Sequence, residues 1–115
     1  FAPPTAKTFQ YSPTICGLDR DENGAATDYT RYVAAVAGGT LFITSSTEAD
    51  WASGTTSFKP WTAIASVTPA AAPDCVVFTD NTVHVVILTS AGTIADVYGS
   101  TSTGSWTTKD LGYYP

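Results

Sequence analysis

Aromatic and acidic side chains occur together in several Gly-, Ser- and Thr-rich stretches of the chain. The flat ring of Trp or Tyr can cover the apolar C–H face of a sugar, while a nearby carboxylate accepts hydrogen bonds from the sugar hydroxyls. The predicted sugar-binding residues are Trp51, Asp50, Glu48, Tyr98, Asp96 and Trp106. For Trp106, as for Trp61, packing in the core is the favoured alternative, because a large ring buries about 150–250 Å².

An acidic segment resembles the opening of a calcium-binding loop. Asp19, Asp21 and Asn23 have the alternating spacing of the first oxygen ligands in such loops. Thr30 stands where an EF-hand carries its bidentate Glu, but Asp28 could replace that ligand in a shorter loop. These residues predict a candidate calcium site at Asp19, Asp21, Asn23 and Asp28, with a solvated polar turn as the alternative.

Residues for catalysis are sparse. His84 is the only histidine, it lies in an apolar run where a packed or edge-exposed role is expected, and the chain has no G-x-S-x-G motif. Asp50 and Asp96 could serve as the carboxylate pair of a glycoside hydrolase, although their spacing in sequence does not fix their separation. We therefore predict that the protein is not an enzyme and keep a small glycoside hydrolase as an alternative.

Composition narrows the classes of partner. The 115-residue chain has a net charge of −5, and its five basic residues are scattered, so no basic patch for nucleic acid is expected. No apolar run reaches the roughly 20 residues of a membrane span, so membrane insertion is not expected. Because the chain starts at Phe1, we expect that a signal peptide has been removed and that the protein is secreted and extracellular.

The two cysteines, Cys16 and Cys75, are far apart and form no C-x-x-C pair. A secreted chain is expected to oxidise them to one disulfide. Its closed loop would contribute about 4 kcal/mol in the chain-entropy model. Two buried free thiols are the alternative.

Strand-like runs alternate with turn signals from Tyr29 onward, as in all-β domains. A Gly38-Gly39 turn predicts a hairpin of 32–37 with 40–44. The second half predicts a three-stranded meander over 75–78, 83–88 and 93–98. A helix over 27–37 is an alternative, because apolar residues there also recur at helical spacing, and it would make the fold α+β.

A weak internal repeat relates the two halves. Tyr32–Leu41 aligns with Val85–Ile94 at an offset of 53 residues, and Pro60–Ile64 resembles Ser105–Thr108. We predict an all-β fold of blade-like antiparallel meanders, forming two propeller-like units whose ring is completed by oligomerisation, with a β-sandwich as an alternative. The predicted single β domain has an N-terminal arm and acidic loop (1–28), a first unit (29–66) and a second unit (67–115).

The segment from Val85 to Leu111, VVILTSAGTIADVYGSTSTGSWTTKDL, resembles the blade pattern of small fungal and bacterial propeller lectins of the fucose-lectin type. In that family an Arg on the second strand and a Glu on the third bind the sugar, and a Trp stacks on it. The matching positions are Val86 and Asp96, with Val33 and Ile43 in the first unit. The resemblance therefore implies the fold but not the fucose site, since the arginine is missing from both units.

A looser resemblance, by size, secretion and composition, is to small secreted mushroom immunomodulatory proteins. Together these features favour a secreted carbohydrate-binding recognition protein of the lectin type, with a defence-related or immunomodulatory role, no required cofactor and cell-surface glycans or glycoproteins as partners. Homo-oligomers, most simply dimers or trimers, are expected. A receptor-binding or cell-wall structural protein without a sugar site is the alternative, as is the glycoside hydrolase.

Overall fold

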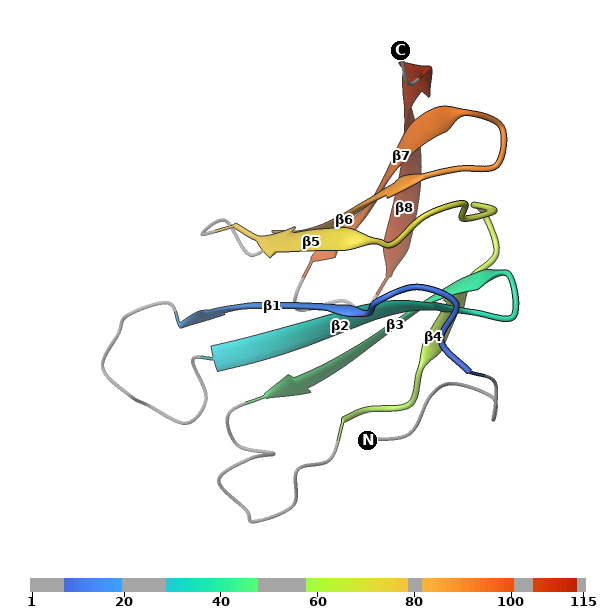
Figure 1. The fold of residues 1–115 in the computed structure, drawn as a ribbon. Helices are drawn as coiled ribbons and strands as arrows, with labels where there is room; N and C mark the ends of the chain where they lie inside the picture. Colours follow the sequence, from blue (N-terminus) through green and yellow to red (C-terminus); the bar gives the residue numbers. More distant parts are fainter. Residues whose placement is uncertain (1–7, 20–28, 48–57, 79–81, 101–104, 114–115) are drawn as a thin grey trace.

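The computed structural model describes residues 8–19, 29–47, 58–78, 82–100 and 105–113, and all regular structure in them is β-strand (Figure 1). Two four-stranded antiparallel sheets are present, each a simple meander. The first sheet consists of β1 (Thr14–Asp19), β2 (Tyr29–Ala37), β3 (Thr40–Thr47) and β4 (Thr62–Ile64). The second consists of β5 (Asp74–Val77), β6 (Thr82–Leu88), β7 (Thr93–Ser100) and β8 (Trp106–Tyr113). The predicted all-β fold of two blade-like meanders is confirmed.

Glycines make the two central hairpins possible. Gly38 and Gly39 adopt φ angles of 58° and 80°, as the predicted tight turn between β2 and β3 requires. The turn between β6 and β7 is longer and has Gly92 at a φ of 81°. The strands on both sides pair in register, Val36 with Leu41 in the first sheet and Ile87 with Ala95 in the second.

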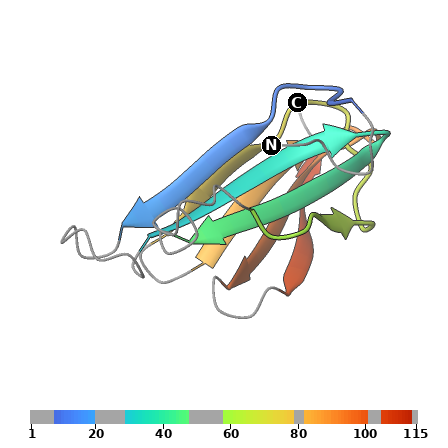
Figure 2. The ribbon, with the colours of Figure 1, turned by 90° about the horizontal axis from the view of Figure 1, so that it is seen from below.

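The two sheets pack through their inner faces, and Figure 2 shows the strands of the first sheet crossing obliquely over those of the second. Their shared core is built from alternate residues of the central strands, as a period of two requires. It contains Tyr32, Ala34, Val36, Leu41, Ile43 and Ile64 from the first sheet, and Val83, Val85, Ile87, Ala95 and Val97 from the second.

A disulfide joins the first strands of the two sheets. Cys16 on β1 is bonded to Cys75 on β5, with Cα atoms 5.9 Å apart, and β1 lies beside β5 (Figure 1). The predicted pairing is therefore confirmed, and the alternative of two free thiols is wrong. Equivalent strands of the two meanders are thus linked covalently at their common edge.

The helix alternative over 27–37 is wrong, because Tyr29–Ala37 forms strand β2. Both faces of this strand are buried, so apolar residues occupy consecutive positions and match a helical period by coincidence. The first sheet also begins earlier than the first unit defined from the sequence. Its edge strand β1 lies within 1–28, the segment expected to be an arm and loop.

The outer face of the first sheet is covered by the chain itself. We call it the covered face; its residues are Val33, Ala35, Ala37, Phe42, Thr44 and Ser46, all buried. Trp61 contacts both Phe9 and Phe42 edge-to-face, with ring centroids 6.4 and 6.5 Å apart. The backbone N–H of Gln10 donates to the Val36 carbonyl at 2.8 Å. These contacts form a second, smaller core.

The outer face of the second sheet differs. We call it the open face; its residues are Asp74, Val76, Phe78, His84, Val86, Leu88, Ile94, Asp96, Tyr98, Thr107 and Lys109. Val76, Phe78 and Val86 remain 42%, 47% and 37% exposed.

Within the described residues, no helix is long and apolar enough to span a bilayer.

Candidate functional site

The sugar-binding residues predicted from the sequence lie on different surfaces. Tyr98 and Asp96 point outward from β7 on the open face, whereas Trp106 belongs to the inner face of β8 and packs against the core. Trp51, Asp50 and Glu48 lie outside the described residues. The structure therefore brings Tyr98 and Asp96 together but separates both from Trp106 by the thickness of the second sheet.

On the open face, the groups that could hold a sugar already contact one another. The Nδ1 atom of His84 lies 2.9 and 3.1 Å from the two carboxylate oxygens of Asp96. The His84 ring stacks on Tyr98 at 5.5 Å and meets Phe78 edge-on at 5.1 Å. Because both Asp96 oxygens and one face of Tyr98 are engaged, this cluster is better suited to packing than to sugar binding.

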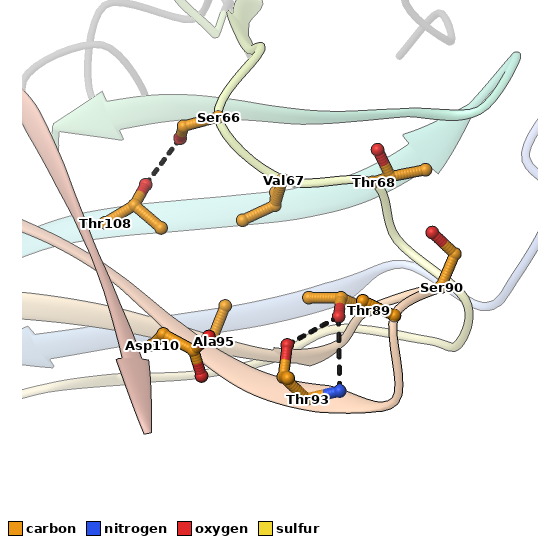
Figure 3. A pocket seen from close by; sticks show the side chains of 10 residues that line it. Ser66, Val67, Thr68, Thr89, Ser90, Thr93, Ala95, Thr108 and Asp110 are labelled. Atoms are coloured by element: carbon orange, nitrogen blue, oxygen red, sulfur yellow. Dashed lines mark hydrogen bonds between the residues drawn. The ribbon is translucent and has the colours of Figure 1, made fainter. Parts of the chain in front are cut away.

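A hollowed surface lies elsewhere, where β8 approaches the segment that leads from β4 to β5. It consists of two hollows that share Ser66, of about 330 and 240 Å³. We call them together the cleft. The larger hollow is lined by Thr62, Ala63, Ile64, Ala65, Ser66 and Trp106. The smaller is lined by Ser66, Val67, Thr68, Thr89, Ser90, Ala91, Thr93, Ala95, Thr108 and Asp110 (Figure 3).

Strand geometry aligns three side chains along the cleft. Trp106, Thr108 and Asp110 are spaced two residues apart on β8, so they share one face of the strand. At about 3.3 Å per residue, Trp106 and Asp110 are roughly 13 Å apart along the strand. An aromatic ring therefore stands at one end of the cleft and a carboxylate at the other, with a hydroxyl between them.

Packing fixes the position of Trp106. Its ring meets the buried Tyr32 edge-to-face at 6.1 Å, and the ring is half-buried. Gly99 on β7 lies opposite Trp106, and a Cβ atom there would come within 2.3 Å of the Ser105 carbonyl oxygen and 3.3 Å of the Trp106 ring. The absence of a side chain at Gly99 thus lets β8 approach closely enough to place the indole in the cleft.

Hydrogen bonds between hydroxyls organise the smaller hollow. The hydroxyls of Ser66 and Thr108 form a hydrogen bond, and this bond connects the segment that follows β4 to β8 (Figure 3). The hydroxyls of Thr89 and Thr93 form another, 2.7 Å long, across the β6–β7 turn. The Ser90 N–H donates to the Thr68 carbonyl at 2.9 Å. Hydroxyl groups can both donate and accept, so the same wall can accommodate the mixed donors and acceptors of a polyol.

The carboxylate at the end of the cleft is oriented by the backbone. Asp110 Oδ1 accepts a hydrogen bond from the Gly112 N–H at 2.8 Å. Gly112 has a φ of 110°, and the β7–β8 register shifts at Ile94 and Ala95, next to this point. The irregular backbone holds one oxygen of Asp110, while Oδ2 has no hydrogen-bond partner in the part of the chain that the structure describes.

The predicted calcium ligands stay untested. Asp19 is the last residue of β1, and Asp21, Asn23 and Asp28 lie outside the described residues. Among the residues that are described, no group of three or more His, Cys, Asp or Glu side chains is placed to hold a metal ion.

Most residues of the cleft were missed by sequence reasoning. The richness in Ser and Thr was noted, but the hydroxyls that meet here come from distant segments, as Ser66 and Thr108 do. Alternation along Trp106–Tyr113 was the available signal, because it assigns Thr108 and Asp110 to the same face as Trp106. Comparisons of the chain and its structure with family models, curated proteins and solved structures gave no match.

Proposed function

We propose that the protein is a secreted carbohydrate-binding recognition protein of the lectin type and that the cleft is its sugar site. The observation that carries the proposal is the row of Trp106, Thr108 and Asp110 along one face of β8, facing the hydroxyl-bearing segment at Ser66. An aromatic ring, hydroxyls and a carboxylate are the groups that match the apolar face and the hydroxyl edge of a sugar.

Each group has a distinct role in the proposed complex. One sugar ring lies against Trp106 in the larger hollow, whose volume of about 330 Å³ is near the lower end of the usual 300–1,000 Å³ range for small-molecule sites. A second ring extends toward Asp110, which accepts hydrogen bonds from its hydroxyls. Thr108 and Ser66 exchange their mutual hydrogen bond for bonds to the bridging part of the ligand. The favoured ligand is therefore a short oligosaccharide.

The negative charge of the cleft and of the whole chain restricts the kind of sugar that we expect the cleft to bind. Asp110 is the charged residue lining the two hollows, and the chain carries a net charge of −5. A sulfated or carboxylated sugar would place an anion against this carboxylate. Neutral glycans of cell surfaces or glycoproteins are thus favoured over acidic ones.

The proposal is for binding without catalysis. His84 is the only histidine of the chain, and it lies on the open face with both Asp96 oxygens close to its Nδ1 atom. The cleft is on the other side of the second sheet, so this pair is not placed to act on a ligand there. Secretion is part of the proposal, and the Cys16–Cys75 disulfide is compatible with an extracellular location.

Assembly into a homo-oligomer is also part of the proposal, because several linked sites raise the overall binding of weak single sites by about 10²–10⁴. A ring of propeller blades would pack the covered face of one copy against the open face of the next. Phe9 and Trp61 already occupy the covered face. Because these two residues fill the covered face, we favour an assembly that leaves it intact over a closed propeller ring.

A glycan array followed by calorimetry on the best ligand tests the proposed site. Thr108→Val and Asp110→Asn should weaken binding, because each removes a polar contact from the cleft. We expect a loss of about 3–10-fold for the neutral hydroxyl and about 10–100-fold for the charged acceptor. Thr107→Val and Asp74→Asn, which alter the open face away from the cleft, are the matched controls and should leave the calorimetric affinity of a single cleft for a monovalent ligand unchanged. Equal losses in variants and controls, or no glycan bound by the wild-type protein, would contradict the proposal.

A further inference from the structure

The open face is the largest difference between two sheets of the same topology. The covered face keeps Phe42 at 7% exposed, whereas Val76, Phe78 and Val86 on the open face are 42%, 47% and 37% exposed. These three side chains lie on neighbouring strands β5 and β6 or directly after β5. Exposed apolar side chains that gather in one place are characteristic of an interaction surface.

The charged residues of the open face make it complementary to the open face of a second copy of the chain. One row across the sheet reads Asp74, Val86, Asp96 and Lys109, from β5 to β8, in direct register. At about 4.8 Å between strands, Asp74 and Lys109 are roughly 14 Å apart and at opposite edges. Asp96 is already contacted by His84. The row therefore has an acidic edge and a basic edge that cannot contact each other within one chain.

A two-fold axis parallel to the strands brings the acidic edge of one copy against the basic edge of the other. When two open faces meet across such an axis, β5 of one copy lies over β8 of the other. Lys109 then faces Asp74 of the partner subunit, and the symmetry repeats the pair at the other edge. In the same row Val86 of each copy covers the His84–Asp96 pair of the other. An interface of this kind uses the same patch on both subunits, as two-fold dimers do.

We propose that the open face is the interface of a symmetric homodimer, with Lys109 paired to Asp74 across it at both edges. Four strands about 4.8 Å apart and about seven residues long give a face of roughly 440 Å² per copy. The total of about 900 Å² is below the usual 1,600 Å² of stable complexes, so the dimer is reversible. This interface leaves the cleft uncovered and does not depend on sugar binding.

Sedimentation velocity over concentrations from about 1 µM to about 1 mM tests the dimer, since this range spans dissociation constants of weak complexes. The wild-type protein should shift from its monomer mass of 12.0 kDa to twice that mass as concentration rises. Lys109→Asp and Asp74→Lys should each raise the dissociation constant at least about tenfold, because each places like charges together at both edges. Circular dichroism confirms that the variants keep their β-sheet structure.

The double variant Asp74→Lys/Lys109→Asp restores opposite charges and should return the dissociation constant to within about threefold of the wild-type value. Lys59→Asp changes an exposed lysine beside the first sheet and serves as the control with no expected effect. A monomer at all concentrations, a trimer, or single variants that associate like the wild-type protein would each overturn the proposal. Failure of the double variant to recover would overturn the proposed axis.

Discussion

The two sheets have the same topology, but the outer face of the first is buried and the outer face of the second is exposed. The first sheet has its outer face buried beneath Phe9 and Trp61, so its central strands carry apolar or small residues on both sides. The second sheet keeps its outer face open and carries the His84–Asp96 pair and exposed aliphatic residues there. The repeated meander therefore accounts for the inner core that both sheets share. Segments outside the repeat bury the outer face of the first sheet and leave the outer face of the second sheet exposed.

Removing the disulfide should have the largest effect on stability and should show which sheet depends on it more. The double variant Cys16→Ser/Cys75→Ser frees a loop with a sequence separation of 59 residues, so we expect the free energy of unfolding to fall by about 4 kcal/mol. Urea denaturation measures this loss. In hydrogen exchange, the first sheet, packed on both faces, should remain protected longer than the second. Faster exchange in the first sheet would reverse the comparison.

A pair of phenylalanine truncations compares the two outer faces directly. Phe42→Ala removes a buried ring that contacts Trp61, so it should lower the free energy of unfolding by about 3–4 kcal/mol. Phe78→Ala removes a half-exposed ring on the open face and should cost about 1 kcal/mol or less. Chemical denaturation of both variants provides the measurement. Similar losses would show that the open face is packed as firmly as the covered one.

Alanine substitutions at two glycines of the second sheet distinguish the cost of disturbing close packing from the cost of an unfavourable turn conformation. Gly99→Ala forces a Cβ to within 2.3 Å of the Ser105 carbonyl oxygen, so strand β8 must shift. We expect a loss of about 2–3 kcal/mol together with a change in Trp106 fluorescence. Gly92→Ala meets no neighbouring atom within 4 Å but retains a φ of 81°, which should cost about 1–2 kcal/mol without affecting the fluorescence. The opposite ranking would contradict the close approach at Gly99.

The smallest expected effect is the coupling between His84 and Asp96. A double-mutant cycle with His84→Gln and Asp96→Asn should give an interaction free energy of about 0.5–1 kcal/mol, as partly exposed hydrogen-bonded side-chain pairs do. Thermal or urea unfolding at one fixed pH is sufficient. A coupling of zero would mean that the pair does not organise the open face.

Local signals explain what could be predicted from the sequence. The Gly38-Gly39 turn predicts its hairpin because only glycine accepts both positive φ angles without cost, and the regular spacing of turns predicts the second meander. The disulfide followed from there being only two cysteines. None of these inferences required knowledge of how distant segments meet.

The repeat itself was only partly in register. The offset of 53 residues places Leu41, in the core, on Ile94, which pairs with Leu88 on the other face of the second sheet. The hairpin between β6 and β7 is longer than the Gly38-Gly39 turn, which changes the register of the following strand. Because side chains alternate with a period of two, such a shift moves a residue to the opposite face.

Other features depended on tertiary structure. Strand β1 is defined by its pairing with β2, and its sequence, TICGLD, has no strong local strand signal around Gly17. The cleft depends on the meeting of Ser66 with Thr108, which are 42 residues apart. The pairing register of β7 with β8, which local sequence does not specify, places Trp106 on the opposite face of the sheet from Asp96 and Tyr98.

The most direct test of the proposed sugar site is a titration of the isotope-labelled protein with its best array ligand, followed by amide and indole chemical shifts. We predict that the largest changes occur at the Trp106 indole and at the amides of Ser66, Thr108 and Asp110, while Tyr98 and Asp96 on the open face change little. Changes centred on the open face, or spread evenly over both sheets, would contradict a sugar site in the cleft.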